Sequence, residues 1–419
     1  MKKRFLVPAV FCASINCQAS DYFFKPVFNS YERYETNIFL IPKPSQDNWI
    51  TTLSPGLNFG LHRENTQLNS NFTWNKLFYT NQSKLDIDEQ LVNVDFQNQT
   101  DRFTWGGQSS YKNQASINQV GTINGLALTQ VMSKRISIAP TVSYSLDQRS
   151  TLSLDYSYEK VTYEKNENNY LANYDYHQAS GTYSYLYTEH DKLNMSLSSS
   201  RYKTPLQNQT SFNHVAQLGW QHSFSEKLVA YVSGGINYSQ VETTVPQLIP
   251  GLYLGIFPAF FDPETLSPFD PTTGFLIRQQ RFKKIERNGI GKVFRASLQK
   301  SFERGNVSFI ALQNQTPTSQ GLQTQTQLSI SGAYTINERW TSGLTAGFTR
   351  YEQTGQQNSF LNRTYYSISP NINWKWTPEI SLGLTYIYRE QDFKSGSQAS
   401  GNSVQLQFTY QPQTNYQVK

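Results

Sequence analysis

The chain has 419 residues, a mean hydropathy of −0.57 and a formal net charge of +6 at pH 7. This charge is too small for the length of the chain to indicate a nucleic-acid-binding protein. The 27 tyrosines, 26 phenylalanines and 7 tryptophans exclude a disordered chain, since such chains are poor in aromatic residues. Beyond the N-terminal segment, no apolar run approaches the roughly 20 residues of a membrane helix. A closed membrane barrel, in which every second residue can be polar, fits this composition.

Residues 1–19 have the pattern of a secretory signal peptide. Basic residues in Met1–Arg4 precede the apolar run Phe5–Phe11, and a small-residue exit ends at Ala19. We expect cleavage after Ala19, which leaves residues 20–419 as a single barrel domain. Both cysteines, Cys12 and Cys17, lie in the leader, so no disulfide and no thiolate site is expected after it. The leader also holds three of the basic residues, which lowers the net charge further.

Period-two alternation of apolar and polar residues predicts strands along most of the chain. The first two are expected at Phe23–Glu35 and Asp47–Gly60. The clearest pattern is the hairpin Ile136–Tyr163, in which Leu, Ile, Val and Tyr share one parity and Ser, Thr and Asp share the other. Its polar turn is Asp147–Ser150, and each arm is about as long as the ~9–11 residues that cross a bilayer. The last strand, Ser403–Tyr410, alternates in the same way.

Short turns and longer polar segments alternate between the predicted strands. This asymmetry is typical of outer-membrane barrels, whose short turns are periplasmic. The number of strands between these connections is eighteen, with sixteen as the alternative, in an all-β, single antiparallel transmembrane barrel. Compact turns are expected at 62–66, 98–102, 147–150, 188–192, 223–227, 302–306, 336–339 and 376–379, and longer segments near 80–88, 112–134, 160–171, 201–211, 240–287, 313–324, 351–361 and 391–402.

The segment Val245–Arg278 is unlike the other connections. It holds six of the seventeen prolines together with an apolar core, Leu252–Phe257. Proline removes donors from a strand ladder, so we expect no strand pair here. A long loop with its own apolar residues packs on something, and we expect it either to constrict the lumen or to cap the outer mouth. A purely structural loop, packed on its neighbours, is the alternative.

Short segments in the first and middle strands carry a resemblance to a known family. They are Tyr34-Glu35-Thr36-Asn37-Ile38, Asp47-Asn48-Trp49-Ile50, Leu53-Ser54-Pro55-Gly56-Leu57, Ala139-Pro140-Thr141-Val142-Ser143-Tyr144-Ser145-Leu146 and Tyr156-Ser157-Tyr158-Glu159-Lys160-Val161-Thr162-Tyr163. The chain resembles outer-membrane β-barrel proteins associated with exosortase/PEP-CTERM and exopolysaccharide gene clusters. The resemblance covers most of the chain and implies a part in export of a surface polysaccharide. It brings no catalytic residues with it.

The residues offer little enzymatic chemistry. The five histidines are scattered without a metal-ligand spacing, so we expect no metal site and no cofactor. His190, beside Glu189 and Asp191, is the only close acid–histidine group, and it lies in a predicted turn. A solvated turn is the simpler interpretation, and we expect no catalytic residues.

Basic residues on the polar parity of the strands are the remaining candidates. Rings of Arg or Lys in a pore favour anions, and guanidinium groups hold carboxylates through paired hydrogen bonds. Such residues would contact an acidic sugar polymer in the lumen. The simpler alternative is that they pair with inward acids such as Asp155 and Glu159. The candidate lumen residues are Arg281, Arg295, Arg363, Lys375 and Arg389.

We therefore expect a non-enzymatic barrel of the bacterial outer membrane, exported by a Sec-type route. Its expected function is to provide or gate a hydrophilic path for an exopolysaccharide. The alternatives are a general diffusion porin for small solutes and a structural or adhesive barrel with a closed lumen. Expected partners are outer-membrane lipid and lipopolysaccharide, with polysaccharide and periplasmic export proteins as further candidates, and no nucleic acid.

Overall fold

A computed structural model of the chain describes residues 21–42, 45–116, 130–164, 171–205, 208–248, 260–261, 268–269, 280–319, 321–353, 362–394 and 396–412. The leader expected at 1–19 lies outside these residues. The strands are β1 Asp21–Glu35, β2 Asn48–His62, β3 Thr66–Tyr79, β4 Ile87–Gln99, β5 Phe103–Ala115, β6 Met132–Ser145, β7 Ser150–Tyr163, β8 Tyr174–Leu186, β9 Asp191–Thr204, β10 Gln209–Ser225, β11 Leu228–Leu248, β12 Phe260–Phe261, β13 Pro268–Phe269, β14 Gln280–Phe302, β15 Gly305–Thr318, β16 Gly321–Thr335, β17 Trp340–Gln353, β18 Arg363–Lys375, β19 Ile380–Phe393 and β20 Gln398–Tyr410, with a short 3-10 helix at Ser83–Leu85.

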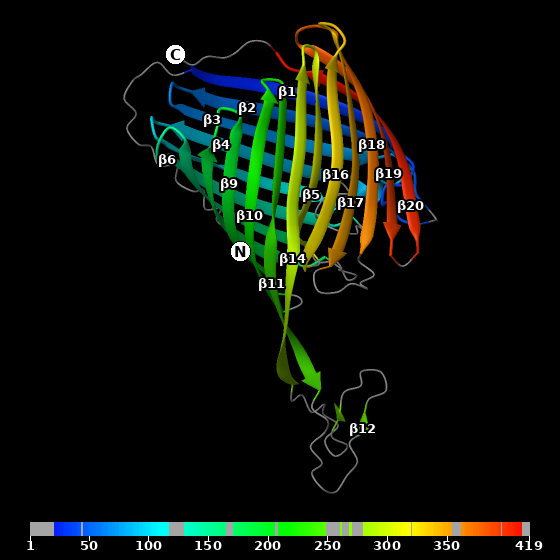
Figure 1. Ribbon diagram of the computed structural model, residues 1–419. Helices are drawn as coiled ribbons and strands as arrows, with labels where there is room; N and C mark the ends of the chain where they lie inside the picture. The colour runs from blue at the N-terminus through cyan, green and yellow to red at the C-terminus, as the bar shows by residue number, and fades with distance from the viewer. Residues whose placement is uncertain are drawn as a thin grey trace.

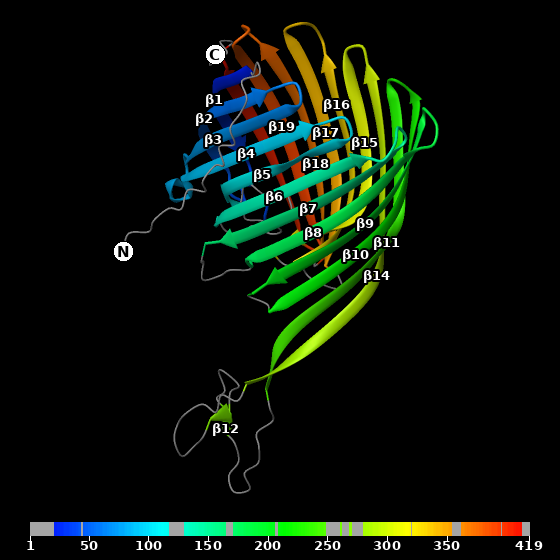
Figure 2. The same cartoon turned by 90° about the vertical axis from the view of Figure 1, so that its left-hand side faces the viewer.

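The described strands form a closed antiparallel barrel (Figures 1 and 2). Eighteen of them belong to one sheet, and consecutive strands pair with each other throughout. The sheet closes where β1 pairs with β20, from Phe28 opposite Tyr410 to Glu35 opposite Ser403. The prediction of an all-β barrel with eighteen strands is therefore confirmed. No helix among the described residues has the length and apolarity to cross a membrane.

The period-two pattern separates an apolar outer face from a polar inner face. In β7 the outward Leu152, Leu154 and Tyr156 are exposed, Leu154 to 53%. The inward Asp155 instead accepts a hydrogen bond from Thr141 Oγ1 at 2.6 Å, across the pair with β6. An outer surface of exposed Leu, Ile, Phe and Tyr is what lipid tails contact, whereas an inner surface of Ser, Thr, Asn and Gln suits water. We call this inner surface the lumen wall.

One end of the barrel carries the compact turns and is called the turn end. The side chain of the first turn residue accepts hydrogen bonds from the backbone N–H groups of the residues two and three positions further along the chain. Asp147 Oδ1 accepts from Arg149 N at 2.7 Å and Ser150 N at 2.8 Å, and Asn337 Oδ1 accepts from two backbone N–H groups at 2.9 Å. Such local hydrogen bonds explain why Asp, Asn and Thr recur there. All eight predicted turn positions coincide with strand connections.

The other end, the loop end, departs from prediction in three places. Segments 201–211 and 313–324 are mostly strand, because β9 and β10 and also β15 and β16 run almost to each other. Their ends are polar on both faces, which hides the alternation. The expectation of no strand pair in Val245–Arg278 was also wrong. β11 continues to Leu248 and places Pro246 opposite Phe282, and within the segment β12 pairs with β13. Residues 249–259, 262–267 and 270–279 lie outside the described part, so the constricting or capping role of this loop stays a prediction.

The β11–β14 hairpin leaves the barrel wall before it ends. The pairing of β11 with β14 continues to Leu248 opposite Gln280, whereas β14 pairs with β15 only from Phe294 onward. Figures 1 and 2 show the two strands extending beyond their neighbours and twisting away from the barrel. Ile290, in the part of β14 that β15 does not cover, is 80% exposed. One edge of β14 is therefore unpaired in the sheet between Gln280 and Val293.

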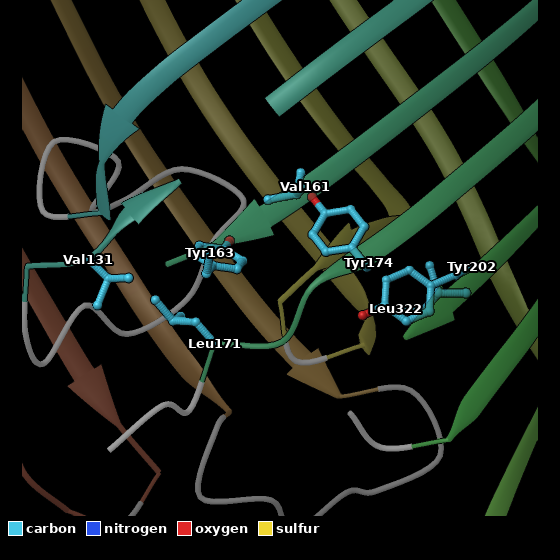
Figure 3. Packing of buried hydrophobic residues seen from close by; sticks show 7 residues of the cluster. All are labelled: Val131, Val161, Tyr163, Leu171, Tyr174, Tyr202 and Leu322. Carbon is cyan, nitrogen blue, oxygen red and sulfur yellow. The ribbon is translucent and has the colours of Figure 1, made fainter. Parts of the chain in front are cut away.

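Three clusters of buried apolar residues lie at the loop end. One cluster contains Ile38, Ile50 and Leu77, and another contains Leu40, Tyr351 and Tyr365. The third joins residues from β7, β8, β9 and β16, as Figure 3 shows, and consists of Val131, Val161, Tyr163, Leu171, Tyr174, Tyr202 and Leu322. The loop end is thus packed like a protein core, while the wall below it faces the lumen.

Candidate lumen site

Four of the five predicted residues share the inward parity of the lumen wall. The register places Arg295 opposite Leu312, Arg363 opposite Phe393, Lys375 opposite Ser381 and Arg389 opposite Gly401. Glu35 and Ser403 face each other on the lumen wall, and the register from strand to strand places these four pairs on the same face. The backbone of Arg281 pairs with Gln247 in the hairpin that leaves the wall. The Arg281 side chain lies outside the described residues.

The four residues do not form one ring. Lys375 ends β18 beside the turn at 376–379, and Arg295 lies farther along the lumen wall on β14. Arg363 begins β18 at the loop end, and Arg389 lies in the loop-end half of β19. Only the last two belong to a built cluster of charged and aromatic side chains. The sequence predicted their face correctly, whereas their contact with substrate stays a prediction.

Glu35 joins two arginines from different strands. Its carboxylate forms an ion pair with Arg389, and Arg33 Nε lies 3.5 Å from its second oxygen. The Glu35 side chain is 5% exposed and the Arg389 side chain 14%, so water reaches little of the pair. The buried carboxylate of Glu89 also interacts electrostatically with Arg33, so two acids face these two arginines. We call Arg33, Glu35 and Arg389 the arginine cluster.

Arg363 is held differently, by aromatic rings. Its guanidinium carbon lies 4.7 Å from the centroid of the Tyr351 ring, a cation–π contact, and the residue is only 5% exposed. Within the described residues its Nε has no hydrogen-bond partner. A buried guanidinium group of this kind is strongly attractive to an anion that can reach it.

The connection after β1 lines the lumen beside these arginines. Asn37 Nδ2 donates to Ser400 O at 3.1 Å and to Ile41 O at 2.8 Å, which ties the segment to β20. Leu40 has a φ of 48°, a left-handed conformation that is strained for a non-glycine residue. Its side chain is buried against Tyr351, Tyr365 and Phe393, and this packing compensates for the strain.

A second set of contacts crosses the lumen from the far wall. Tyr202 of β9 donates a hydrogen bond to Thr318 O at the end of β15, at 2.8 Å, and Ala172 N donates to Ser319 O at 3.2 Å. Three strands, β10, β11 and β14, separate β9 from β15 in the sheet, so the β15–β16 tip reaches across the inside of the barrel. Nearby, Arg135 and Glu159 form an ion pair at 3.0 Å. The lumen is narrowed at this level.

Sequence reasoning missed two residues of the arginine cluster and the tyrosine beside Arg363. Arg33, Glu35 and Tyr351 lie on the same parity as the predicted residues and follow from the same alternation rule. The expected pairing of lumen bases with Asp155 and Glu159 is correct for Glu159, whose partner is Arg135. The acid–histidine pair of the structure is Asp191 with His222, at 2.7 Å, rather than with His190. It lies at the turn end, and the described residues contain no group of three or more metal-ligating side chains.

Comparisons with known proteins give distant structural matches. No protein-family model and no curated protein matches the chain. It is similar to the ferric-catecholate import receptor Fiu of E. coli K12, with 8% identity, a TM-score of 0.48 and coverage of 92% of this chain and 81% of that one. It is also similar to OpdO of Pseudomonas aeruginosa (8% identity, TM-score 0.45, 94% and 97% coverage). The outer-membrane channel DcaP of Acinetobacter baumannii gives 11% identity, a TM-score of 0.43 and the same coverage.

Proposed function

We propose that the chain is an outer-membrane channel that gives an exopolysaccharide a hydrophilic path through a narrow, positively charged loop end. The arginine cluster is the observation that carries this proposal. Its two guanidinium groups contact Glu35, and Arg33 also interacts with Glu89. The buried Arg363 lies in the same end of the barrel with no described acid paired to it, so three arginines there face two carboxylates. Positive charge at a narrow level of a pore favours anions, and acidic sugars carry carboxylates that guanidinium groups bind.

The lumen wall supports a path for a hydrated polymer. Its inward side chains are mainly hydroxyls and amides, which exchange hydrogen bonds with water and with sugar hydroxyls. Binding at each level is then weak, and a moving chain needs sites that it can leave. The resemblance of the first strands to barrels of exopolysaccharide clusters agrees with this cargo.

A structural barrel with a closed lumen is the second candidate. The packed clusters at the loop end and the contact between Tyr202 and Thr318 favour it, because they fill space that a wide pore would need. A general diffusion porin is the third, and it differs from the first by having no preference for sugar polymers.

Planar-bilayer recordings separate these functions. We expect an anion-selective current that an acidic oligosaccharide blocks. Arg33→Gln should shift the reversal potential in a salt gradient toward the cation side, because Arg33 is the more exposed base of the cluster. Lys300→Gln is the matched control, since Lys300 has the outward parity and lies over the Phe302 ring.

Each outcome decides between the candidates. An unblocked current with the same selectivity in both variants supports a porin and contradicts the proposal. The absence of current in the folded protein supports the closed barrel. A blocked current that shifts only in Arg33→Gln is the result that the proposal requires.

A further inference from the structure

A row of side chains crosses the lumen wall in the turn-end half of the barrel. The register places Phe23, Gly60, Asn69, Asp95 and Gln108 directly opposite one another on β1 to β5. Neighbouring strands lie about 4.8 Å apart, so this row repeats its polar groups at roughly that interval. Gly60 makes room for the aromatic ring, since a Cβ there would lie 2.2 Å from Phe23 Cε1.

A second row runs beside the first, one step toward the loop end. It contains Lys25, Asn58, Asn71, Asn93 and Ser110, again directly opposite one another on β1 to β5. Asn71 Nδ2 donates to Asn58 Oδ1 at 2.7 Å, which fixes the orientation of both amides. Lys25 Nζ lies 5.2 Å from the centroid of the Phe23 ring. The two rows together are called the amide rows.

Two cavities follow the amide rows. One, of about 270 Å³, is lined by Lys25, Asn58 and Asn93, and the other, of about 460 Å³, by Gln108 and residues up to β7. They share Asn69 and Asp95, so they adjoin each other along the wall, and together they are called the hollow. Asn69, Asp95 and Gln108 are exposed to it.

The chemistry of this hollow differs from that of the arginine cluster. A sugar hydroxyl both donates and accepts hydrogen bonds. Side-chain amides can take either role toward it, and a carboxylate can accept from two hydroxyls. Within the described residues no hydrogen bond or ion pair occupies the Asp95 carboxylate. The charges of Lys25 and Asp95 cancel, and Asp155 at the far end of the hollow adds a negative charge. A polyanion is therefore disfavoured here, whereas a neutral polyol is not.

We infer that the amide rows bind an extended segment of neutral sugars, with consecutive sugar units on consecutive strands. The repeated spacing across five strands fits a polymer better than a single small solute. This inference deepens the proposed function and rests on it for the physiological cargo. The arginine cluster would attract the acidic sugars of such a chain, and the amide rows would hold the neutral ones.

Calorimetric titration of the full-length, detergent-folded protein tests this site. The neutral probe is maltoheptaose, and the acidic probe is an oligogalacturonate of similar length. We expect maltoheptaose to bind more tightly than the acidic probe. The double variant Asn69→Leu with Gln108→Leu should bind maltoheptaose about 10-fold more weakly, because it removes two side chains that hydrogen-bond sugar hydroxyls.

Two further variants keep the result interpretable. Gln217→Leu with Gln327→Leu removes two inward amides elsewhere on the lumen wall and should leave the affinity unchanged. Asp95→Asn removes the repelling charge and should strengthen binding of the acidic probe. Retained heat-modifiable mobility on a gel shows that each variant is folded.

The inference is overturned if both double variants bind maltoheptaose equally well, or if the acidic probe binds the unaltered protein more tightly. Displacement of maltoheptaose by millimolar Mg²⁺ would instead identify a cation site at Asp95 and also overturn it. Equilibrium binding needs no current, so a protein that binds maltoheptaose through Asn69 yet conducts no ions would contradict the proposed channel and leave this site in place.

Discussion

The two ends of the barrel hold their charges in opposite ways. At the loop end, Glu35 and Arg389 are almost covered by protein and lie among packed aromatic and aliphatic side chains. Toward the turn end, Asp95 and Gln108 face an open hollow along the wall. Where water is excluded, loss of an ion-pair partner leaves a charge uncompensated and destabilises the fold, whereas a solvated charge is stabilised by water. The charges of Glu35 and Arg389 therefore contribute to the stability of the fold, whereas that of Asp95 contributes little to it.

Removal of one acid from each end gives the largest contrast. Glu35→Ala leaves Arg389 without its carboxylate in a buried position and should lower the free energy of unfolding by about 3–5 kcal/mol. Asp95→Ala, on the exposed wall, should change it by no more than about 0.5 kcal/mol. Denaturant-induced unfolding in detergent, followed by tryptophan fluorescence, measures both. Equal losses in the two variants would show that the loop end is as solvated as the wall.

The contact that crosses the lumen should have an intermediate effect. Tyr202→Phe keeps the ring, which packs on Tyr174 with centroids 5.3 Å apart, and removes the hydroxyl that donates to Thr318 O. We expect a loss of about 1 kcal/mol in the free energy of unfolding. Tyr187→Phe, at an exposed position of the turn end, is the control. A Tyr202→Phe protein as stable as the control would mean that the tip of β15 does not depend on this bond.

The smallest effect on the free energy of unfolding is expected at Asp147, a solvent-exposed residue in the turn between β6 and β7. Backbone N–H groups of Arg149 and Ser150 donate to Asp147 and lower the pKa of its carboxyl group. The pKa of this carboxyl group is lower in the folded state than in the unfolded state, so its ionised form stabilises the fold. This stabilisation is fully present above the unfolded pKa of about 3.9, and it is lost as pH falls through the folded pKa. Asp147→Asn should abolish that dependence. The difference in unfolding free energy between the two proteins should therefore shrink below about pH 4, and a constant difference would contradict it.

The turn end and the strands were predictable because their rules are local. The alternation of Leu152 and Leu154 with Ser153 and Asp155 marks two faces without any knowledge of distant residues. Asp147 begins a turn because its own side chain satisfies the next backbone groups. The inward parity of Arg363 and Arg389 followed from the same rule.

The loop end was not predictable from local rules. Tyr202 and Thr318 are 116 residues apart, and no alternation pattern indicates that they meet. Strand ends such as 313–318 carry polar residues on both faces, since they extend past the apolar band, and they therefore read as loop. The grouping of Arg33, Glu35 and Arg389 also needed the closing pair of β1 with β20, which only the folded barrel provides.

The short β14–β15 ladder affects how the barrel can deform. That ladder, from Phe294 to Phe302, and the closing ladder, from Phe28 to Glu35, are the two shortest in the described sheet. They divide the wall into two panels, β1 to β14 and β15 to β20, each internally joined by longer ladders. Separation of the two panels along these two ladders would break fewer backbone hydrogen bonds than separation along any other two ladders of the described sheet. The tip of β15 and the arginine cluster lie at the margins of the panels, so a small rotation between panels would move them relative to each other.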